Sequence, residues 1–290
     1  MAQTIACANQ KGGVGKTTTV VNLAAYLALA GERVLIVDLD PQGNATSGFG
    51  IDRAALEATL YDVILGDTAI DATIVSTAVE RCSIVPASVS LAGAEVELAI
   101  ADQRERRLSK VLAPVRDAYD YVLLDCPPSL GLLTVNALTA ADSVLIPTQC
   151  EFYALEGLSQ LIATLNLVRD NLNPALAIKG VVLTMYDART NLSADVATEV
   201  RNHLGEAVFD TIIPRSVRLS EAPSFGLPIA LYRGDSRGAI AYAALAAELR
   251  RRDGHAPPIS APGLEMPAGP PSVPVVEPTP RHVLAVGGSR

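Results

Sequence analysis

The sequence has no tryptophan, and aromatic residues make up only 4% of its 290 residues. Three histidines and four cysteines are spread along the chain, without the C-x-x-C or Cys/His spacing of a metal site. The cysteines have apolar neighbours, so we expect small core residues in a reducing compartment, and neither disulfides nor metal ligands. They are Cys7, Cys82, Cys126 and Cys150.

Long apolar runs are also missing. No stretch reaches the roughly 18 apolar residues of a membrane-spanning helix, and the first ten residues leave no room for a secretory signal peptide. We therefore expect a cytoplasmic protein that does not enter a membrane. Positive charge is scarce as well, because 23 Lys and Arg against 31 Asp and Glu give a net charge of -8. This excludes a globally basic nucleic-acid-binding protein and leaves only a local basic patch.

Hydrophobic residues, by contrast, make up 49% of the chain, which is enough for a large buried core. The composition changes near Asp253, where the last 38 residues contain 9 Pro and 5 Gly. This predicts a flexible C-terminal tail over residues 253–290, after a single folded domain over residues 1–252. The tail has a net charge of -1, so the folded domain carries -7 and is itself acidic.

Within residues 1–252, short apolar runs alternate with helical patterns, which indicates parallel strands joined by crossover helices. Several runs, such as VLIV and VLL, are wholly apolar and suit strands covered on both faces. The predicted fold class is α/β, a doubly wound and mostly parallel sheet with helices on both faces. The expected strands are Thr4–Ala8, Val34–Asp38, Ser83–Pro86, Tyr121–Asp125, Ser143–Pro147, Lys179–Thr184 and Val208–Ile213. The expected helices are Lys16–Ala30, Ala54–Leu65, Arg104–Asp117, Thr134–Ala140, Leu155–Asn171, Ser193–Leu204 and Gly238–Arg252.

A phosphate-binding loop stands between the first strand and the first helix, which is the context that such a loop requires. Its glycines let backbone N–H groups face phosphates, and the helix N-terminus adds partial positive charge. Lys16 is predicted to reach the β- and γ-phosphates, and Thr17 to ligate Mg²⁺. A glycine-rich turn that merely opens a helix is the alternative, and it leaves the ending Gly15-Lys16-Thr17 unexplained. The predicted nucleotide-binding residues of the loop are Gly12, Gly13, Val14, Gly15, Lys16, Thr17 and Thr18.

Aspartates follow two strands of the predicted sheet. Asp38 and Asp40 lie two residues apart after VLIV, on one face of an extended segment, and both are expected to point toward the phosphate loop. Asp125 ends the apolar run YVLLD, a Walker B pattern whose aspartate is predicted to hold Mg²⁺. An aspartate that only caps a loop remains the alternative for Asp38 and Asp40.

The phosphate loop departs from the usual G-x-x-x-x-G-K-[ST] pattern, because Gln10 stands where Gly is expected and Lys11 is added. The resulting KGG-x-GK-T resembles the deviant phosphate loop of the ParA/MinD group of ATPases. From about Ala2 to Arg252 the chain is most similar to the chromosomal ParA/Soj family, which shares the fold of P-loop NTPases. The segments that carry this resemblance are NQKGGVGKTTTVVNLA, VDLDPQGNATSGFG, YDYVLLDCPPSLGLLTVNAL, EFYALEGLSQL, TMYDARTNLS and IPRSVRLSEAPSFG.

The resemblance implies roles for single residues. Lys11 would contact the partner's ATP across a nucleotide-sandwich dimer, and Lys16 and Asp40 would complete the catalytic set, with Asp40 orienting or activating the attacking water. Asp38 would support Mg²⁺ through water, beside Thr17 and Asp125. Pro214 would pack on the adenine and the residue at 216 would contact it, although many relatives carry Asn where this chain has Ser216.

The resemblance also implies a function. An ATP-bound homodimer would bind double-stranded DNA without sequence preference at the nucleoid, and a ParB-like centromere-binding protein would stimulate ATP hydrolysis and release it, so that a chromosome or plasmid is moved. Arg189 and Arg218 match the family's DNA contacts, and Arg250, Arg251 and Arg252 in the last helix are plausible additions. For these three, a solvated helix end favoured by the helix dipole explains the arginines equally well.

Other nucleotide-dependent proteins fit less well. A MinD-like membrane-associated ATPase that regulates cell-division placement would need an amphipathic C-terminal helix, and this chain ends in a Pro-rich segment. A redox ATPase would need interface cysteines with suitable spacing, a bacterial tyrosine kinase would need a cluster of tyrosines in the tail, and a binding module with incidental hydrolysis would not need Asp40. Because the phosphate loop starts almost at the first residue, we expect no helix-turn-helix extension and no reading of an operator sequence.

Overall fold

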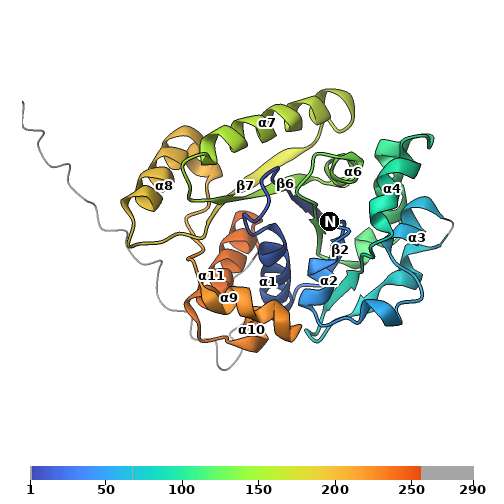
Figure 1. Ribbon diagram of the computed structural model, residues 1–290, viewed down its shortest axis with the longest axis horizontal. Coiled ribbons are helices and arrows are strands. Elements are labelled where there is room, and N and C mark those ends of the chain that lie inside the picture. The colour runs from blue at the N-terminus through green and yellow to red at the C-terminus, as the bar shows by residue number, and fades with distance from the viewer. Residues whose placement is uncertain (1, 67, 256–290) are drawn as a thin grey trace, which may run out of the picture.

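Seven strands form one sheet in the computed structural model, which describes residues 2–66 and 68–255 (Figure 1). The strands are β1 (Gln3–Cys7), β2 (Val34–Asp38), β3 (Val75–Ser76), β4 (Cys82–Val85), β5 (Tyr121–Asp125), β6 (Ser143–Gln149) and β7 (Ala177–Thr184). Their order across the sheet is β3-β4-β2-β5-β1-β6-β7, and all neighbours are parallel except the short edge strand β3. The predicted doubly wound parallel sheet is confirmed. The sequence predicts a tail over residues 253–290, and residues 256–290 of it lie outside the described residues.

The helices cover both faces of this sheet (Figure 1). One core lies under α1 (Lys16–Leu29), α2 (Asn44–Gly48), α9 (Val217–Glu221), α10 (Ile229–Tyr232) and α11 (Arg237–Arg252). The other lies under α3 (Leu60–Leu65), α4 (Leu91–Leu98), α5 (Arg107–Leu112), α6 (Leu132–Ala140), α7 (Ala154–Asn171) and α8 (Asn191–Leu204). Strand β2 shows the reason, because its alternate side chains point into opposite cores: Val34 and Ile36 into the first, Leu35 and Val37 into the second.

The cysteines lie in the core, as expected from their apolar neighbours. All four are unpaired and buried, two in each core. Within the described ranges, no helix has the length and apolar character needed to cross a bilayer.

Two expected helices are shorter than their patterns. The helix expected over 54–65 begins only at Leu60, because Thr59 and Asp62 form a capping box there, and residues 53–55 make a separate 3₁₀ turn. The helix expected over 104–117 is regular only from Arg107 to Leu112, just before Pro114, and is flanked by 3₁₀ turns. The short helices α2, α4, α9 and α10 were not predicted.

The strand expected over Val208–Ile213 is wrong as a regular strand. The segment runs beside β7, where Phe209 N donates to Val181 O at 2.9 Å, but its pairing with β7 amounts to one isolated bridge, between Val208 and Val181. The backbone N–H groups of Asp210 and Thr211 instead donate to the buried carboxylate of Glu248 on α11, each at 2.9 Å. A distant helix therefore accepts hydrogen bonds that a strand would direct to its neighbour.

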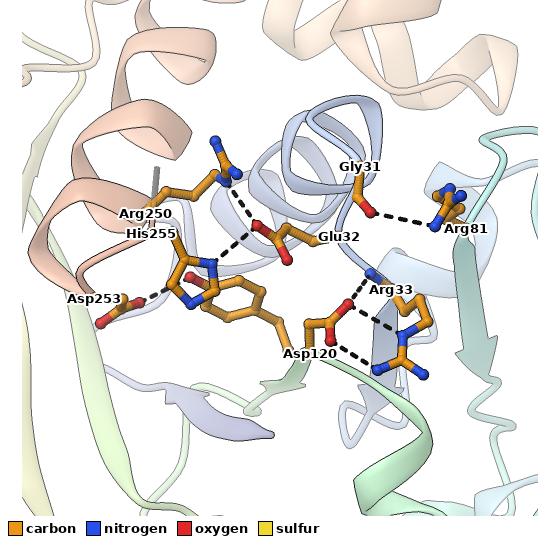
Figure 2. Close-up of polar contacts among 9 residues, drawn as sticks. Gly31, Glu32, Arg33, Arg81, Asp120, Arg250, Asp253 and His255 are labelled. Atoms are coloured by element: carbon orange, nitrogen blue, oxygen red, sulfur yellow. Dashed lines mark hydrogen bonds and ion pairs between the residues drawn. The ribbon is translucent and has the colours of Figure 1, made fainter. Parts of the chain in front are cut away.

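The C-terminal end of α11 is fixed at the amino edge of the sheet (Figure 2). Arg250 Nε donates to Glu32 at 2.8 Å, and His255 Nδ1 lies 3.0 Å from the same carboxylate. Asp253 pairs with Lys179 and accepts a hydrogen bond from the Tyr121 hydroxyl at 2.9 Å. These contacts continue past residue 252, where the sequence predicts the domain to end, and they leave the opposite, carboxyl edge of the sheet for the loops that carry the predicted site.

Candidate functional site

The phosphate loop joins the end of β1 to the start of α1. Gly13 and Gly15 adopt φ values of 76° and 90°, a left-handed conformation that other residues rarely take. Gly15 is the N-cap of α1, so the first backbone N–H groups of this 14-residue helix are available to an anion at the loop. Asn9 lies before the phosphate-loop motif and was not predicted to have a role. It donates to Pro147 O at 2.8 Å and accepts from Lys11 N at 3.0 Å. This residue ties the loop to β6.

The two lysines of the loop have different surroundings. Lys16 is buried, and its Nζ donates to the carbonyl oxygen of Lys11 at 3.3 Å. Lys11 is partly exposed, and its Nζ pairs with the carboxylate of Glu151, in the loop between β6 and α7. Lys16 therefore belongs to the phosphate loop of its own chain, whereas the Lys11 ammonium is held by a loop remote in sequence.

Asp125 and Asp38 lie directly opposite each other, as register partners at the ends of β5 and β2. Asp125 is fully buried, and neither of its carboxylate oxygens accepts a hydrogen bond from the described part of the chain. Burial, and then repulsion from Asp38, raise the pKa of Asp125 well above its usual range, and the nearby Thr17 and Lys16 offset only part of this effect. A buried carboxylate without partners is the feature expected of a residue that faces a cation.

Asp38 is equally buried but well supplied with hydrogen bonds. Its Oδ2 accepts from Thr46 N at 2.8 Å and from the Thr46 hydroxyl at 2.7 Å, and its Oδ1 accepts from Asp40 N at 3.2 Å. Burial raises the pKa of Asp38 to about 6, although these hydrogen bonds act in the opposite direction. Asp40 is also buried, and its Oδ1 accepts from Gln42 N at 2.9 Å. The capping contact predicted as the alternative role of Asp40 is therefore present, but it uses only one of its two oxygens.

This donor set fits Mg²⁺ better than a metal that needs a full protein cage. The described residues include no group of three or more His, Cys, Asp and Glu arranged around a common point. Mg²⁺ is commonly held by one or two carboxylates together with water and substrate phosphates. Asp125 and Asp38, beside a loop that can bind phosphate, match that pattern.

The residues expected at the adenine lie next to the carboxyl end of β7. Tyr186, which follows β7, forms a parallel bridge with Pro214, and Arg215 N donates to Tyr186 O at 2.9 Å. Ser216 is the N-cap residue of α9. The hydroxyl of Thr184, the last residue of β7, donates to Val14 O at 2.8 Å, which fixes this strand end against the phosphate loop.

The predicted DNA-contacting arginines are exposed, and each has an acidic partner. Arg189 is 85% exposed and pairs through two hydrogen bonds with Asp187, whose pKa it holds well below the usual range. Arg218 on α9 pairs with Glu221 at 2.7 Å. Both guanidinium groups can reach solvent, but neither presents an unbalanced positive charge.

The arginine run at the end of α11 does not form one surface. Arg250 is buried and bound to Glu32, so it is not available to DNA phosphates in this structure, and we withdraw it from the predicted DNA contacts (Figure 2). Arg252 pairs with Glu248 and lies 4.0 Å above the ring of Phe209, so it too has a structural role. Arg251 alone is exposed without an ion pair among the described residues.

Thr46 is the residue of this site that sequence reasoning missed most clearly. It is fully buried, it donates to Asp38, and its hydroxyl accepts from Ala87 N at 3.1 Å, which connects β2 to the loop after β4. Its only sequence signal is its place in the segment DPQGNATSG after Asp38. A threonine a few residues after a strand is too common to identify such a contact.

Comparison with known proteins gives consistent relatives. Residues 2–178 match the family model of an AAA domain. The sporulation initiation inhibitor protein Soj of Bacillus subtilis is 57% identical over 249 residues, which cover 86% of this chain and 98% of that protein. The chromosome partitioning protein ParA of Myxococcus xanthus is 55% identical over 249 residues, covering 86% of this chain and 88% of that protein.

A solved structure shows the same fold with a nucleotide. Cobyrinic acid a,c-diamide synthase from Mycobacterium smegmatis, with bound ADP and magnesium, has a TM-score of 0.77 at 40% identity. The similarity covers 90% of this chain and all of that chain.

Proposed function

The chain belongs to the Soj/ParA family of chromosome-partitioning ATPases, and from this premise we propose that it is an ATP-dependent switch for DNA segregation. Its ligands are ATP and Mg²⁺, bound at the carboxyl edge of the sheet. The observation that carries the proposal is the buried carboxylate of Asp125, which accepts no hydrogen bond from the described residues and lies opposite Asp38 and near Lys16 of a phosphate loop. A merely structural aspartate at this position would leave two oxygens unsatisfied in the core.

In this proposal the triphosphate lies on the loop formed by residues 11–18. Backbone N–H groups of Gly12, Gly13, Val14 and Gly15 and the start of α1 bind its oxygens, and Thr18 extends this contact. Lys16 neutralises charge on the β- and γ-phosphates. Thr17, Asp38 and Asp125 would hold Mg²⁺, which when bound neutralises the charge that develops as the γ-phosphoryl group is transferred.

Asp40 orients the attacking water. Its Oδ1 is occupied by Gln42 N, and its Oδ2 makes no hydrogen bond within the described residues, so one oxygen is available to accept a proton of water. The base of ATP would pack against Pro214, next to Ser216.

The switch itself is dimerisation. Two ATP-bound copies would meet with their nucleotides at the interface, and Lys11 of each copy would contact the phosphates of the other, which supplies a cation only in the dimer. The dimer would bind double-stranded DNA of any sequence through Arg189 and Arg218, with Arg251 as an addition, and so associate with the nucleoid in the cytoplasm. A ParB-like centromere-binding protein would stimulate hydrolysis and release it.

Steady-state hydrolysis of Mg·ATP tests the assignment of the site. Lys16→Ala should abolish ATP binding, whereas Asp40→Ala should keep binding and lower turnover by about 100-fold or more. Lys110→Ala and Asp117→Asn remove exposed charges of the same kinds and should change neither the affinity for ATP nor the turnover. Normal turnover by Asp40→Ala would refute the role of this residue, and unchanged ATP affinity of Lys16→Ala would refute the phosphate-loop assignment.

A further inference from the structure

Lys11, which is proposed to act on the nucleotide of a second copy, is bound within its own chain. Its ammonium pairs with Glu151, 140 positions away, and the two side chains are 43% and 40% exposed. The carbonyl oxygen of Lys11 accepts from Lys16 Nζ. One residue thus connects the lysine of the chain's own phosphate site to the loop that precedes α7.

The backbone presents Glu151 from a fixed position. The preceding residue, Cys150, is buried, and its N–H donates to Thr184 O at 3.1 Å. Glu151 N donates to Gln149 O at 2.8 Å, and its own carbonyl oxygen accepts from Ala154 N at 3.0 Å. Only the side chains of the pair remain partly in solvent, so the pair can open without any change in the sheet.

The carboxylate of Glu151 and the phosphates of ATP are competing anions for one ammonium group. While Glu151 holds Lys11, the charge of that lysine is neutralised within the monomer. Because the pair is two-fifths exposed, it is weak, and a polyanion that approaches in a desolvated interface can replace the carboxylate.

The surface beside the pair is suited to a second copy of the chain. Phe152 and Tyr153 follow Glu151 directly and are 77% and 64% exposed. Their rings meet edge to face, with the ring centroids 5.2 Å apart. Aromatic surface of this kind next to a charged pair is typical of a protein interface.

We propose that Glu151 is a positioning residue for Lys11. It holds the ammonium in the monomer, and the phosphates of ATP on a second copy take the ammonium over when two copies meet. This inference rests on the proposed ATP-dependent dimer. It adds that the pair helps to set the protein concentration at which the dimer forms, because two such pairs must open for each symmetric dimer. An exposed pair changes an equilibrium constant by a factor of about 1.4 to 5, so two pairs change it by about 2- to 30-fold.

The contact itself is tested in the nucleotide-free protein. Lys11 should react with an amine-acetylating reagent severalfold faster in Glu151→Gln than in the wild type, as measured by mass spectrometry of the modified peptide. Glu156→Gln removes an exposed carboxylate five residues along the chain and should leave the rate unchanged, with Lys110 as the internal reference. Equal rates for Lys11 in Glu151→Gln and the wild type would overturn the inference.

The consequence is tested by sedimentation velocity with Mg²⁺ and a non-hydrolysable ATP analogue. Glu151→Gln should reach half dimer at a protein concentration about 2- to 30-fold lower than the wild type, and Glu156→Gln should match the wild type. A midpoint that is unchanged or higher in Glu151→Gln overturns the positioning role. A wild type that never dimerises contradicts the proposed function and the takeover of Lys11 with it, while the acetylation rates still show whether Glu151 holds Lys11.

Discussion

At the residue scale, the electrostatic cost of the site lies in Asp125, which is buried opposite another carboxylate. Asp125→Asn keeps the shape and removes the charge, so it should stabilise the nucleotide-free protein against unfolding by about 1–3 kcal/mol at neutral pH. It should also remove the extra stability that Mg·ATP gives the wild type. Thermal unfolding with and without Mg·ATP measures both effects, and the exposed Asp117→Asn should show neither.

The benefit of Asp125→Asn should depend on pH. Because folding raises the pKa of Asp125, the folded state binds this proton more tightly than the unfolded chain does. The resulting stability is fully present below the unfolded pKa, about 4, and is lost as pH rises through the folded pKa. The free energy of unfolding of the variant should therefore increase relative to that of the wild type as pH rises above about 4. A difference that stays constant as pH rises above that value would contradict a buried charge at this position.

Thr46 offers a second residue-scale prediction. Thr46→Val removes the hydroxyl that donates to Asp38 and accepts from Ala87 N, and it should cost about 1–3 kcal/mol of stability and raise the Mg²⁺ concentration needed for ATP hydrolysis. Thr46→Ser restores the hydroxyl and should recover most of the Mg²⁺ dependence. If Val and Ser behave alike in Mg²⁺ titrations, the hydroxyl does not position Asp38.

At the scale of elements, the last helix is anchored by a buried ion pair. Arg250→Ala leaves the Glu32 carboxylate without its main partner and should destabilise the protein by about 3 kcal/mol in urea unfolding. Arg251→Ala, one residue further and exposed, should change stability by less than about 0.5 kcal/mol. Equal stabilities of the two variants would show that the ion pair between Arg250 and Glu32 does not contribute to the free energy of unfolding.

The last helix shows which features could be predicted from the sequence and which could not. The phosphate loop and the apolar strands were predicted because their signals are local in sequence. The difference between Arg250 and Arg251 was not, because consecutive helix residues point about 100° apart, and only the packed position of α11 decides which one meets Glu32. In the same way, the segment 208–213 does not form the expected regular strand because two of its backbone N–H groups donate to Glu248, nearly forty residues away.

In the candidate site, too, single residues were predicted from local patterns, whereas the contacts between them were not. Asp38 and Asp125 were each predicted from a strand-end pattern, but their direct opposition requires β2 and β5 to be neighbours, an order that the sequence does not contain. Thr46, Asn9 and Glu151 were missed for a similar reason, since each acts through a contact in the folded chain.

At the scale of the whole molecule, the net charge of -8 opposes DNA binding by a single copy. The acidic partners of Arg189 and Arg218 add to this effect, because each must share its arginine with a phosphate. Binding should therefore need the dimer, which doubles the arginines on one molecule, and it should weaken steeply with salt.

Replacing both arginines tests this surface. Arg189→Glu with Arg218→Glu should abolish DNA binding while ATP hydrolysis and ATP-dependent dimerisation continue. A single change to Ala should lower the slope of the logarithm of the binding constant against the logarithm of salt concentration by about 1 for each arginine removed from the complex. Filter binding at several salt concentrations measures both. DNA binding by the double variant at wild-type affinity would place the DNA surface elsewhere.

Co-sedimentation of the Asp40→Ala protein with DNA tests most directly whether ATP gates the whole switch. The variant should bind ATP without hydrolysing it, so it should remain a dimer and sediment with DNA when ATP is present. With ADP, or without nucleotide, it should stay in the supernatant. Equal sedimentation under all three conditions would contradict an ATP-gated DNA contact, and so would the absence of sedimentation with ATP.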